Sequence, residues 1–212
     1  MLVVETFVFS PFRENTYLIW DDVTNIGAVI DPGCSTPLEE HTLTEAIELN
    51  KINLKFLMNT HIHIDHIFGN RYILDNYDVE LIYPRGDEHL IETMKDEALK
   101  YNFLLNDFRK ADSYFEDIDE LKIGELTCKP IFTPGHTPAE YCLYFPEYKS
   151  CFAGDVLFEE SIGRTDLWGG DLDVLIHSIE NKLFTLPDDT IIYSGHGATT
   201  TIEHEKDFNP FI

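Results

Sequence analysis

Three histidines and an aspartate lie within seven consecutive residues, Thr60–His66, which read THIHIDH. Imidazole nitrogens and carboxylate oxygens are the groups with which proteins bind zinc and similar divalent ions. Alternate side chains of an extended segment share a side, so His61 and His63 point the same way, whereas Asp65 and His66 turn away where a helix begins. A solvated loop has little use for so many imidazoles. The segment therefore predicts a metal site.

Three later stretches repeat one pattern, in which an apolar strand ends in a turn that carries His or Asp beside Gly. They read IFTPGHTP, CFAGDVLF and IIYSGHG. Side chains at strand ends project at the edge of a sheet, so four such ends can converge on one pocket. Together they supply seven candidate donors, namely His61, His63, Asp65, His66, His136, Asp155 and His196. A catalytic zinc uses three protein ligands and leaves one position for water, so seven donors favour two ions about 3.5–4 Å apart that share a carboxylate.

Each later histidine also has a simpler explanation, because a single histidine beside a glycine is more often part of a turn than a ligand. The joint occurrence of four matching strand ends favours the metal interpretation. The remaining histidines lie in helical or terminal polar contexts, and we expect them to be structural or solvated: His41, His89, His177 and His204.

Composition limits the class of protein. The chain has 212 residues, of which 43% are hydrophobic, which suits one globular domain over residues 1–212. The first residues lack the basic region of a signal peptide, and no segment approaches the roughly 18 apolar residues of a membrane span. We therefore expect a soluble, cytoplasmic protein with no membrane partner.

A net charge of -24 disfavours nucleic acid as a partner. The four cysteines include no CxxC pair, so buried thiols are favoured over disulfides or zinc ligands.

Periodicity and turn signals predict alternating strands and helices. We expect strands over residues 16–20, 27–31, 55–59, 79–83, 126–132, 140–145, 150–153 and 190–194, the first two forming a hairpin. We expect helices over residues 36–49, 67–76 and 87–105, and a fourth capped by Asp171 that ends before Pro187. Each half runs from strands to helix. This order predicts an α+β fold in which two sheets pack together with helices outside, in four layers.

The signature HxHxDH followed by a later His, Asp and His resembles the metallo-β-lactamase superfamily over nearly the whole chain. The resemblance implies a four-layer αβ/βα sandwich with the metal site at the edge of the two sheets. It also implies two ligand sets: His61, His63 and His136 for the first ion, Asp65, His66 and His196 for the second, and Asp155 as the bridge. The expected cofactors are two divalent metal ions, zinc first, with iron or manganese as alternatives.

Within this superfamily, the best-known metallo-β-lactamases carry cysteine where this chain has Asp155, and flavodiiron proteins carry glutamate where it has His63. The stretches TPGHTPAEYCLYF, FAGDVLF, SIGRTDLWGGD and SGHGATTTIEHEKDFNPF instead resemble the hydroxyacylglutathione hydrolases (glyoxalase II), particularly their short bacterial type. The resemblance implies a hydrolase for a small-molecule thioester, such as S-lactoylglutathione or a related hydroxyacyl thioester. Water activated between the two metals would attack the carbonyl and expel a thiolate.

Three further residues receive roles under this hypothesis. Asp65 is expected to act in catalysis by binding the second ion and orienting the attacking hydroxide. Arg164 is a candidate for binding a substrate carboxylate, and a salt bridge with Asp166 or Asp171 is its alternative. Tyr141 is a candidate for lining the pocket, with core packing as its alternative. Asp166 stands about where glyoxalase II carries a tyrosine against glutathione, which favours a smaller or different thiol.

Two other functions remain open from the sequence. Persulfide dioxygenases share the fold and the GRTD segment but use one iron, which here would be held by His61, His136 and Asp155. A non-catalytic metal-binding protein is the second alternative, although the donor set is complete. Nuclease activity is disfavoured by the acidic charge. The acyl and thiol parts of the substrate, the metal and the oligomeric state are left undetermined.

Overall fold

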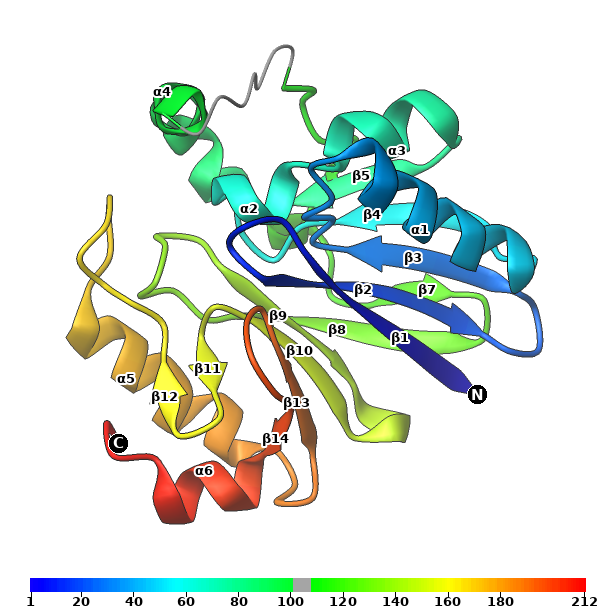
Figure 1. Cartoon of the computed structure of the whole chain (residues 1–212). Coiled ribbons are helices and arrows are strands. Elements are labelled where there is room, and N and C mark those ends of the chain that lie inside the picture. The colour runs from blue at the N-terminus through cyan, green and yellow to red at the C-terminus, as the bar shows by residue number, and fades with distance from the viewer. Residues whose placement is uncertain (101–107) are drawn as a thin grey trace.

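The computed structural model describes residues 1–100 and 108–212, in which two six-stranded sheets face each other (Figure 1). The first sheet follows the chain order from β1 to β6. Strands β1 to β3 pair antiparallel, and β3 to β6 pair parallel. The bounds are β1 Leu2–Phe9, β2 Glu14–Asp21, β3 Ile26–Ile30, β4 Asn53–Met58, β5 Glu80–Tyr83 and β6 Ser113–Tyr114.

The second sheet has the order β14-β13-β10-β9-β8-β7. Strands β10 and β13 pair parallel, and its other neighbours pair antiparallel. A separate two-stranded hairpin, β11–β12, follows β10. The bounds are β7 Leu121–Ile123, β8 Leu126–Phe132, β9 Tyr141–Phe145, β10 Ser150–Gly154, β11 Leu157–Phe158, β12 Ser161–Ile162, β13 Ile191–Ser194 and β14 Thr200–Thr201.

Helices cover the outer face of each sheet (Figure 1). Helices α1 and α3 lie against the first sheet, α5 and α6 lie against the second, and α2 and α4 lie at one end of the sandwich. The α-helices are α1 Pro37–Leu49, α2 Ile64–Ile67, α3 Asn70–Asn76, α4 Ile91–Lys100, α5 Leu172–Asn181 and α6 Ile202–Phe208. Short 3-10 helices are η1 Arg85–Leu90, η2 Phe115–Asp117, η3 Pro146–Tyr148 and η4 Leu183–Thr185. The predicted α+β fold, a four-layer αβ/βα sandwich, is confirmed.

Alternation along the strands divides the core into layers. Leu18 and Leu57 are buried with Leu43 of α1, on the helix side of the first sheet. Their strand neighbours Ile19 and Met58 are buried on the opposite side, in the layer that the two sheets share. A third layer joins the second sheet to α5 and α6. Because side chains of a strand alternate between faces, the apolar runs of β2 and β4 fill both layers at once.

The predicted cap of α1 is confirmed. The Thr36 hydroxyl accepts a hydrogen bond from the Glu39 backbone N–H, and the Glu39 carboxylate accepts one from the Thr36 N–H, which completes a capping box. Asp171 caps α5 as predicted, because its side chain accepts from the Val174 N–H.

The prediction of one helix over residues 67–76 is wrong in detail. Helix α2 already begins at Ile64, and the chain is interrupted before α3 begins at Asn70. The Gly69 N–H donates to the Pro32 carbonyl at 2.7 Å, and a side chain at Gly69 would meet the Cys34 sulfur. The close approach of this backbone to residues 32–34 therefore ends the first helix.

The predicted helix over residues 87–105 begins as the 3-10 helix η1 and continues as α4 to Lys100, and residues 101–105 lie outside the described residues. The sequence prediction missed α6, the β11–β12 hairpin, β7 and β14. These elements are short, so their hydrophobic period is weak.

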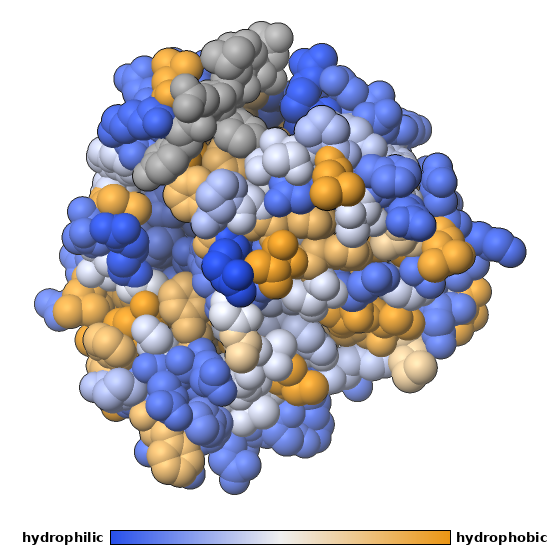
Figure 2. Space-filling view, viewed as in Figure 1, coloured by the Kyte–Doolittle hydropathy of each residue, from blue (hydrophilic) through white to orange (hydrophobic). Residues whose placement is uncertain are grey.

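All four cysteines are buried and unpaired, as predicted: Cys34, Cys128, Cys142 and Cys151. Within residues 1–100 and 108–212, no helix has the length and apolar character that crossing a bilayer would require. Figure 2 shows hydrophilic side chains over most of the visible face and a hollow between α4 and α5.

Candidate metal centre and pocket

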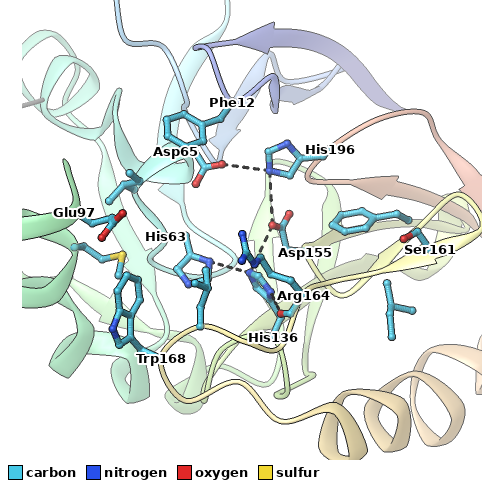
Figure 3. A pocket seen from close by; sticks show the side chains of 15 residues that line it. Phe12, His63, Asp65, Glu97, His136, Asp155, Ser161, Arg164, Trp168 and His196 are labelled. Atoms are coloured by element: carbon cyan, nitrogen blue, oxygen red, sulfur yellow. Dashed lines mark hydrogen bonds and ion pairs between the residues drawn. The ribbon is translucent and has the colours of Figure 1, made fainter. Parts of the chain in front are cut away.

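The seven predicted donors meet at one end of the two sheets. His61 and His63 follow β4, and Asp65 and His66 lie in α2. The loop between β8 and β9 carries His136, and the turns after β10 and β13 carry Asp155 and His196. Their donor atoms form three overlapping groups, each within 4.8 Å: His61, His63 and His136; His61, His66 and Asp155; Asp65, His66 and His196. Parts of the chain 135 positions apart thus supply one cluster. Figure 3 shows five of the donors, His63, Asp65, His136, Asp155 and His196.

The first group, His61, His63 and His136, is buried. The Nε2 atom of His136 lies 2.8 Å from Nδ1 of His63, and the rings of His61 and His136 meet edge to face. Burial lowers the pKa of all three imidazoles, that of His61 well below its ordinary value and that of His63 to about 3. All three are therefore neutral at pH 7, with lone pairs available to a cation.

The second group, Asp65, His66 and His196, has the opposite electrostatics. Its Asp65 Oδ2 lies 3.3 Å from His196 Nε2. Burial would lower the pKa of His66, but Asp155 and Asp65 raise it well above its ordinary value. Burial also opposes ionisation of His196, whose pKa is raised mainly by Asp65. His196 is also more open, since 29% of its side chain is exposed and none of His66 is. This group therefore pairs carboxylates with imidazoles.

Asp155 lies between the two groups. Its Oδ1 is 3.4 Å from His66 Nε2, while its Oδ2 is 3.5 Å from His136 Nε2 and 3.7 Å from His196 Nε2. Burial would raise the pKa of Asp155, but the close contact with His66 and the electrostatic attraction of His66, His136 and His196 together outweigh burial and lower it. An ionised carboxylate between two sets of nitrogens is the arrangement that a bridging ligand needs.

Neighbouring acceptors fix the orientation of the histidine rings. His136 Nδ1 donates to the Arg164 carbonyl at 2.7 Å, and His66 Nδ1 lies 3.2 Å from Asp31 Oδ2. His61 Nδ1 lies 3.3 Å from Oε1 of Glu140. Because Nδ1 of each ring is directed at one of these oxygens, the Nε2 atoms of the rings face the cluster. Sequence reasoning missed Asp31 and Glu140, although each stands at the end of an apolar strand, which was the available signal.

Unsatisfied nitrogens test whether a metal fits. The Nε2 atoms of His61 and His63 are buried and have no hydrogen-bond partner. Both ring nitrogens of His66 and Oδ1 of Asp155 are also buried without such a partner. An unsatisfied buried polar group costs about 1–3 kcal/mol, so five in one cluster require an explanation. Neutral imidazoles together with ionised carboxylates suit zinc, iron and manganese. The donor set therefore fits divalent metal ions.

A pocket of about 430 Å³ opens beside the cluster. Its walls include Phe12 from the β1–β2 turn, Met94 from α4 and Trp168 from the segment before α5 (Figure 3). No specific sequence signal marks these three residues, because their place in the pocket depends on how the layers stack. The pocket is thus an apolar groove whose inner end is the His/Asp cluster.

Arg164 and Tyr141 were predicted to contact the substrate. Arg164 does line the pocket, and its guanidinium Nε and Nη2 each donate to a carboxylate oxygen of Asp166 at 2.7 Å. Both proposed roles of Arg164 thus agree with its position. Tyr141 is not among the lining residues of this pocket. It is buried between the sheets, where its ring packs against Phe115 and Phe132, so its position supports core packing.

Comparison with known proteins identifies the family. Residues 10–196 match the family described as the Metallo-beta-lactamase superfamily. The chain belongs to this superfamily. It is 38% identical to the hydroxyacylglutathione hydrolase GloC of Haemophilus influenzae, over 99% of this chain and 97% of that relative. It is 30% identical to the human mitochondrial persulfide dioxygenase ETHE1, over 92% of this chain and 70% of that protein.

Among solved structures, the chain is similar to TTHA1623 in a di-iron-bound form. The TM-score is 0.84 at 27% identity, and the match covers 98% of this chain and all of that one. The metal site of a similar fold thus accepts two irons in that protein.

Proposed function

We propose that the protein is a binuclear metal-dependent hydrolase that cleaves a thioester such as S-lactoylglutathione or a related hydroxyacyl thioester. The observation that carries this proposal is the pair of donor groups on either side of Asp155, at the inner end of a groove large enough for a small molecule. The similarity to a hydroxyacylglutathione hydrolase over nearly the whole chain supports the thioester as substrate class.

The two groups define the proposed ligands. The first ion would be held by His61, His63 and His136, the second by Asp65, His66 and His196, and both by Asp155. Zinc is the proposed metal because it suits His/Asp sites that keep an open position for water. Iron is the alternative that the di-iron form of TTHA1623 supports, and manganese suits the same donors.

When bound, the metals would lower the pKa of water towards neutrality and polarise the thioester carbonyl. Asp65 would accept a hydrogen bond from the attacking water and so orient it. The apolar walls at Phe12 and Trp168 would shield part of a bound substrate from water, which would strengthen the electrostatic interactions inside the pocket. Arg164 would hold a substrate carboxylate at the pocket mouth. The leaving thiol has a pKa of about 8.5, so it departs as thiolate without a dedicated acid.

Metal content and two activities, measured on one sample, test the proposal. The assays are the loss of S-lactoylglutathione absorbance and oxygen uptake with glutathione persulfide. Two metal ions per chain with thioester loss are expected. One iron per chain with oxygen uptake and no thioester loss would reject the hydrolase.

Persulfide dioxygenase is the second candidate, because of the similarity to human ETHE1. Its single iron would be held by His61, His136 and Asp155, and the last two lie 3.5 Å apart through His136 Nε2 and Asp155 Oδ2. The complete second group, Asp65, His66 and His196, favours the binuclear hydrolase over this candidate. A non-catalytic metal-binding role ranks last, because the donor cluster opens into a groove.

We also propose that residues 1–212 form one folding domain, because apolar side chains of both sheets share one buried layer. A single cooperative unfolding transition is expected by circular dichroism. A cytoplasmic location stays a prediction.

A further inference from the structure

The turn that carries His196 belongs to the second sheet, but a residue of the first sheet holds it. Asn15, near the start of β2, donates three hydrogen bonds to this turn. Its backbone N–H donates to the Gly195 carbonyl at 2.7 Å, and its side-chain Nδ2 donates to the carbonyls of Ser194 at 2.9 Å and Gly197 at 3.0 Å. Asn15 is buried, with 3% of its surface exposed.

The two side-chain bonds bracket His196 along the chain. One accepting carbonyl lies two residues before His196, and the other lies one residue after it. The Tyr17 hydroxyl also donates to Ser194, at 2.5 Å, but it contacts one side of the turn alone. The Asn15 side chain therefore sets the shape of the turn, whereas Tyr17 anchors the end of β13.

The position of this turn bears directly on the donor cluster. A side chain at Gly195 would lie 2.3 Å from Asp155 Oδ1 and 2.8 Å from the His66 ring, so the backbone there is in contact with both residues. His196 Nε2 in turn lies 3.3 Å from Asp65 Oδ2. A change in the shape of the turn would therefore move His196 relative to Asp65, while the first group, His61, His63 and His136, has other supports.

We propose that Asn15 is a positioning residue for the second metal ion, acting through the turn that carries His196. The inference rests on the proposed function, because it needs a second ion. Outer-shell partners of metal ligands affect metal affinity by roughly 10- to 100-fold. The effect of Asn15 should fall on one ion of the two.

The test compares zinc affinity in the wild type and in Asn15→Asp, measured by competition with a chromophoric chelator. The substitution keeps the side-chain shape but replaces the donating amide by a carboxylate oxygen that faces two carbonyls. We expect the zinc site that includes His196 to lose affinity by roughly 10- to 100-fold and the site formed by His61, His63 and His136 to stay within about twofold. Asn15→Ser, which adds no charge, should show a smaller loss in the same direction and replaces the aspartate variant if that variant does not fold.

Asn50→Asp is the matched control. Its side-chain amide also donates to a backbone carbonyl, that of Ala46 at the end of α1, and the substitution adds the same charge. Both zinc sites should stay unchanged in this control. Equal losses at both sites of the Asn15 variants, or no loss at either, would overturn the inference while leaving the hydrolase intact. A wild-type protein that binds one zinc would overturn the proposed function itself.

Discussion

The two donor groups differ in how the chain prepares them for a cation. His61, His63 and His136 are buried and neutral, and the nitrogens of two of them already lie 2.8 Å apart. The second group is held together by carboxylate–imidazole pairs and includes the partly exposed His196. A cation entering the first group meets neutral imidazoles, whereas in the second group it must displace a proton from His66. The first group should therefore bind the tighter ion.

Removing the carboxylate between the groups should have the largest effect. Asp155→Ala should lower kcat/KM by about a thousandfold or more, since even an outer-shell partner is worth roughly 10- to 100-fold. Both zinc affinities should fall, because Asp155 approaches His136 and His66 alike. Chelator competition and steady-state kinetics measure the two effects. Loss at one zinc site alone would show that Asp155 belongs to a single group.

Single histidine deletions should separate the groups. His196→Ala should weaken the looser zinc site and leave the tighter one within about twofold, whereas His136→Ala should weaken the tighter site by about 100-fold. The physical reason is that His136 is a buried, neutral ligand of the first group, and His196 is a partly exposed member of the second. Zinc titration of both variants measures the difference. If the two variants lost zinc affinity equally at the same sites, the two donor groups would not be distinct metal sites.

The residues that support the loops of the two donor groups also differ. Asn15, which contacts the turn of His196, is a neutral amide, whereas Asp87 of η1 is a fully buried carboxylate. Asp87 accepts from the Thr137 hydroxyl at 2.9 Å and from the Ala139 N–H at 3.0 Å, in the loop that carries His136. Burial raises the pKa of Asp87 to about 6. Its favourable contribution to stability is therefore complete below the unfolded-state pKa, near 4, and is lost as the pH rises through 6.

Asp87→Asn cannot ionise, so its stability relative to the wild type should improve by about 2 kcal/mol between pH 4 and pH 8. Chemical denaturation of the metal-free proteins measures this difference. Asp75→Asn, which alters an exposed carboxylate of α3, controls for the change in charge. If the difference in stability between Asp87→Asn and the wild type did not vary with pH, burial would not raise the pKa of Asp87.

The smallest effect is expected far from both groups. Thr36→Ala removes the N-cap of α1 and should lower the free energy of unfolding by about 1 kcal/mol. Zinc affinity should not change, because α1 carries none of the seven donors. Thr42→Ala, in an exposed position of the same helix, should change stability by less than about 0.5 kcal/mol. Altered zinc affinity in Thr36→Ala would show that the cluster depends on the outer helix layer.

The seven donors could be predicted from the sequence because they follow the ends of four apolar strands, and strand ends of packed sheets meet at an edge. His61, His136 and His196 were all found in this way, and the structure brings them together. The residues that hold the turns of these donors in place were not predicted. Asn15 and Asp87 have no local signal, since each contacts a turn that lies 50 or more residues away along the chain.

The interruption of the predicted helix over residues 67–76 could not be predicted for a related reason. The break between α2 and α3 depends on the contact of Gly69 with residues 32–34, which helix periodicity does not record. The glycine itself was a signal, because glycine inside a helical pattern weakens it. The walls of the pocket likewise join Phe12 and Trp168, which lie 156 positions apart in the chain.

Because the donors span residues 61 to 196 and both sheets, bound ions would also act as cross-links between the two halves of the chain. Ions that bind the folded state alone add stability with their concentration, about 4 kcal/mol at a thousandfold excess over the dissociation constant. Metal scarcity would then shorten the lifetime of the protein in the cell, as proteases reach the opened sandwich. The abundance of this protein, and not its turnover number alone, would follow the metal supply.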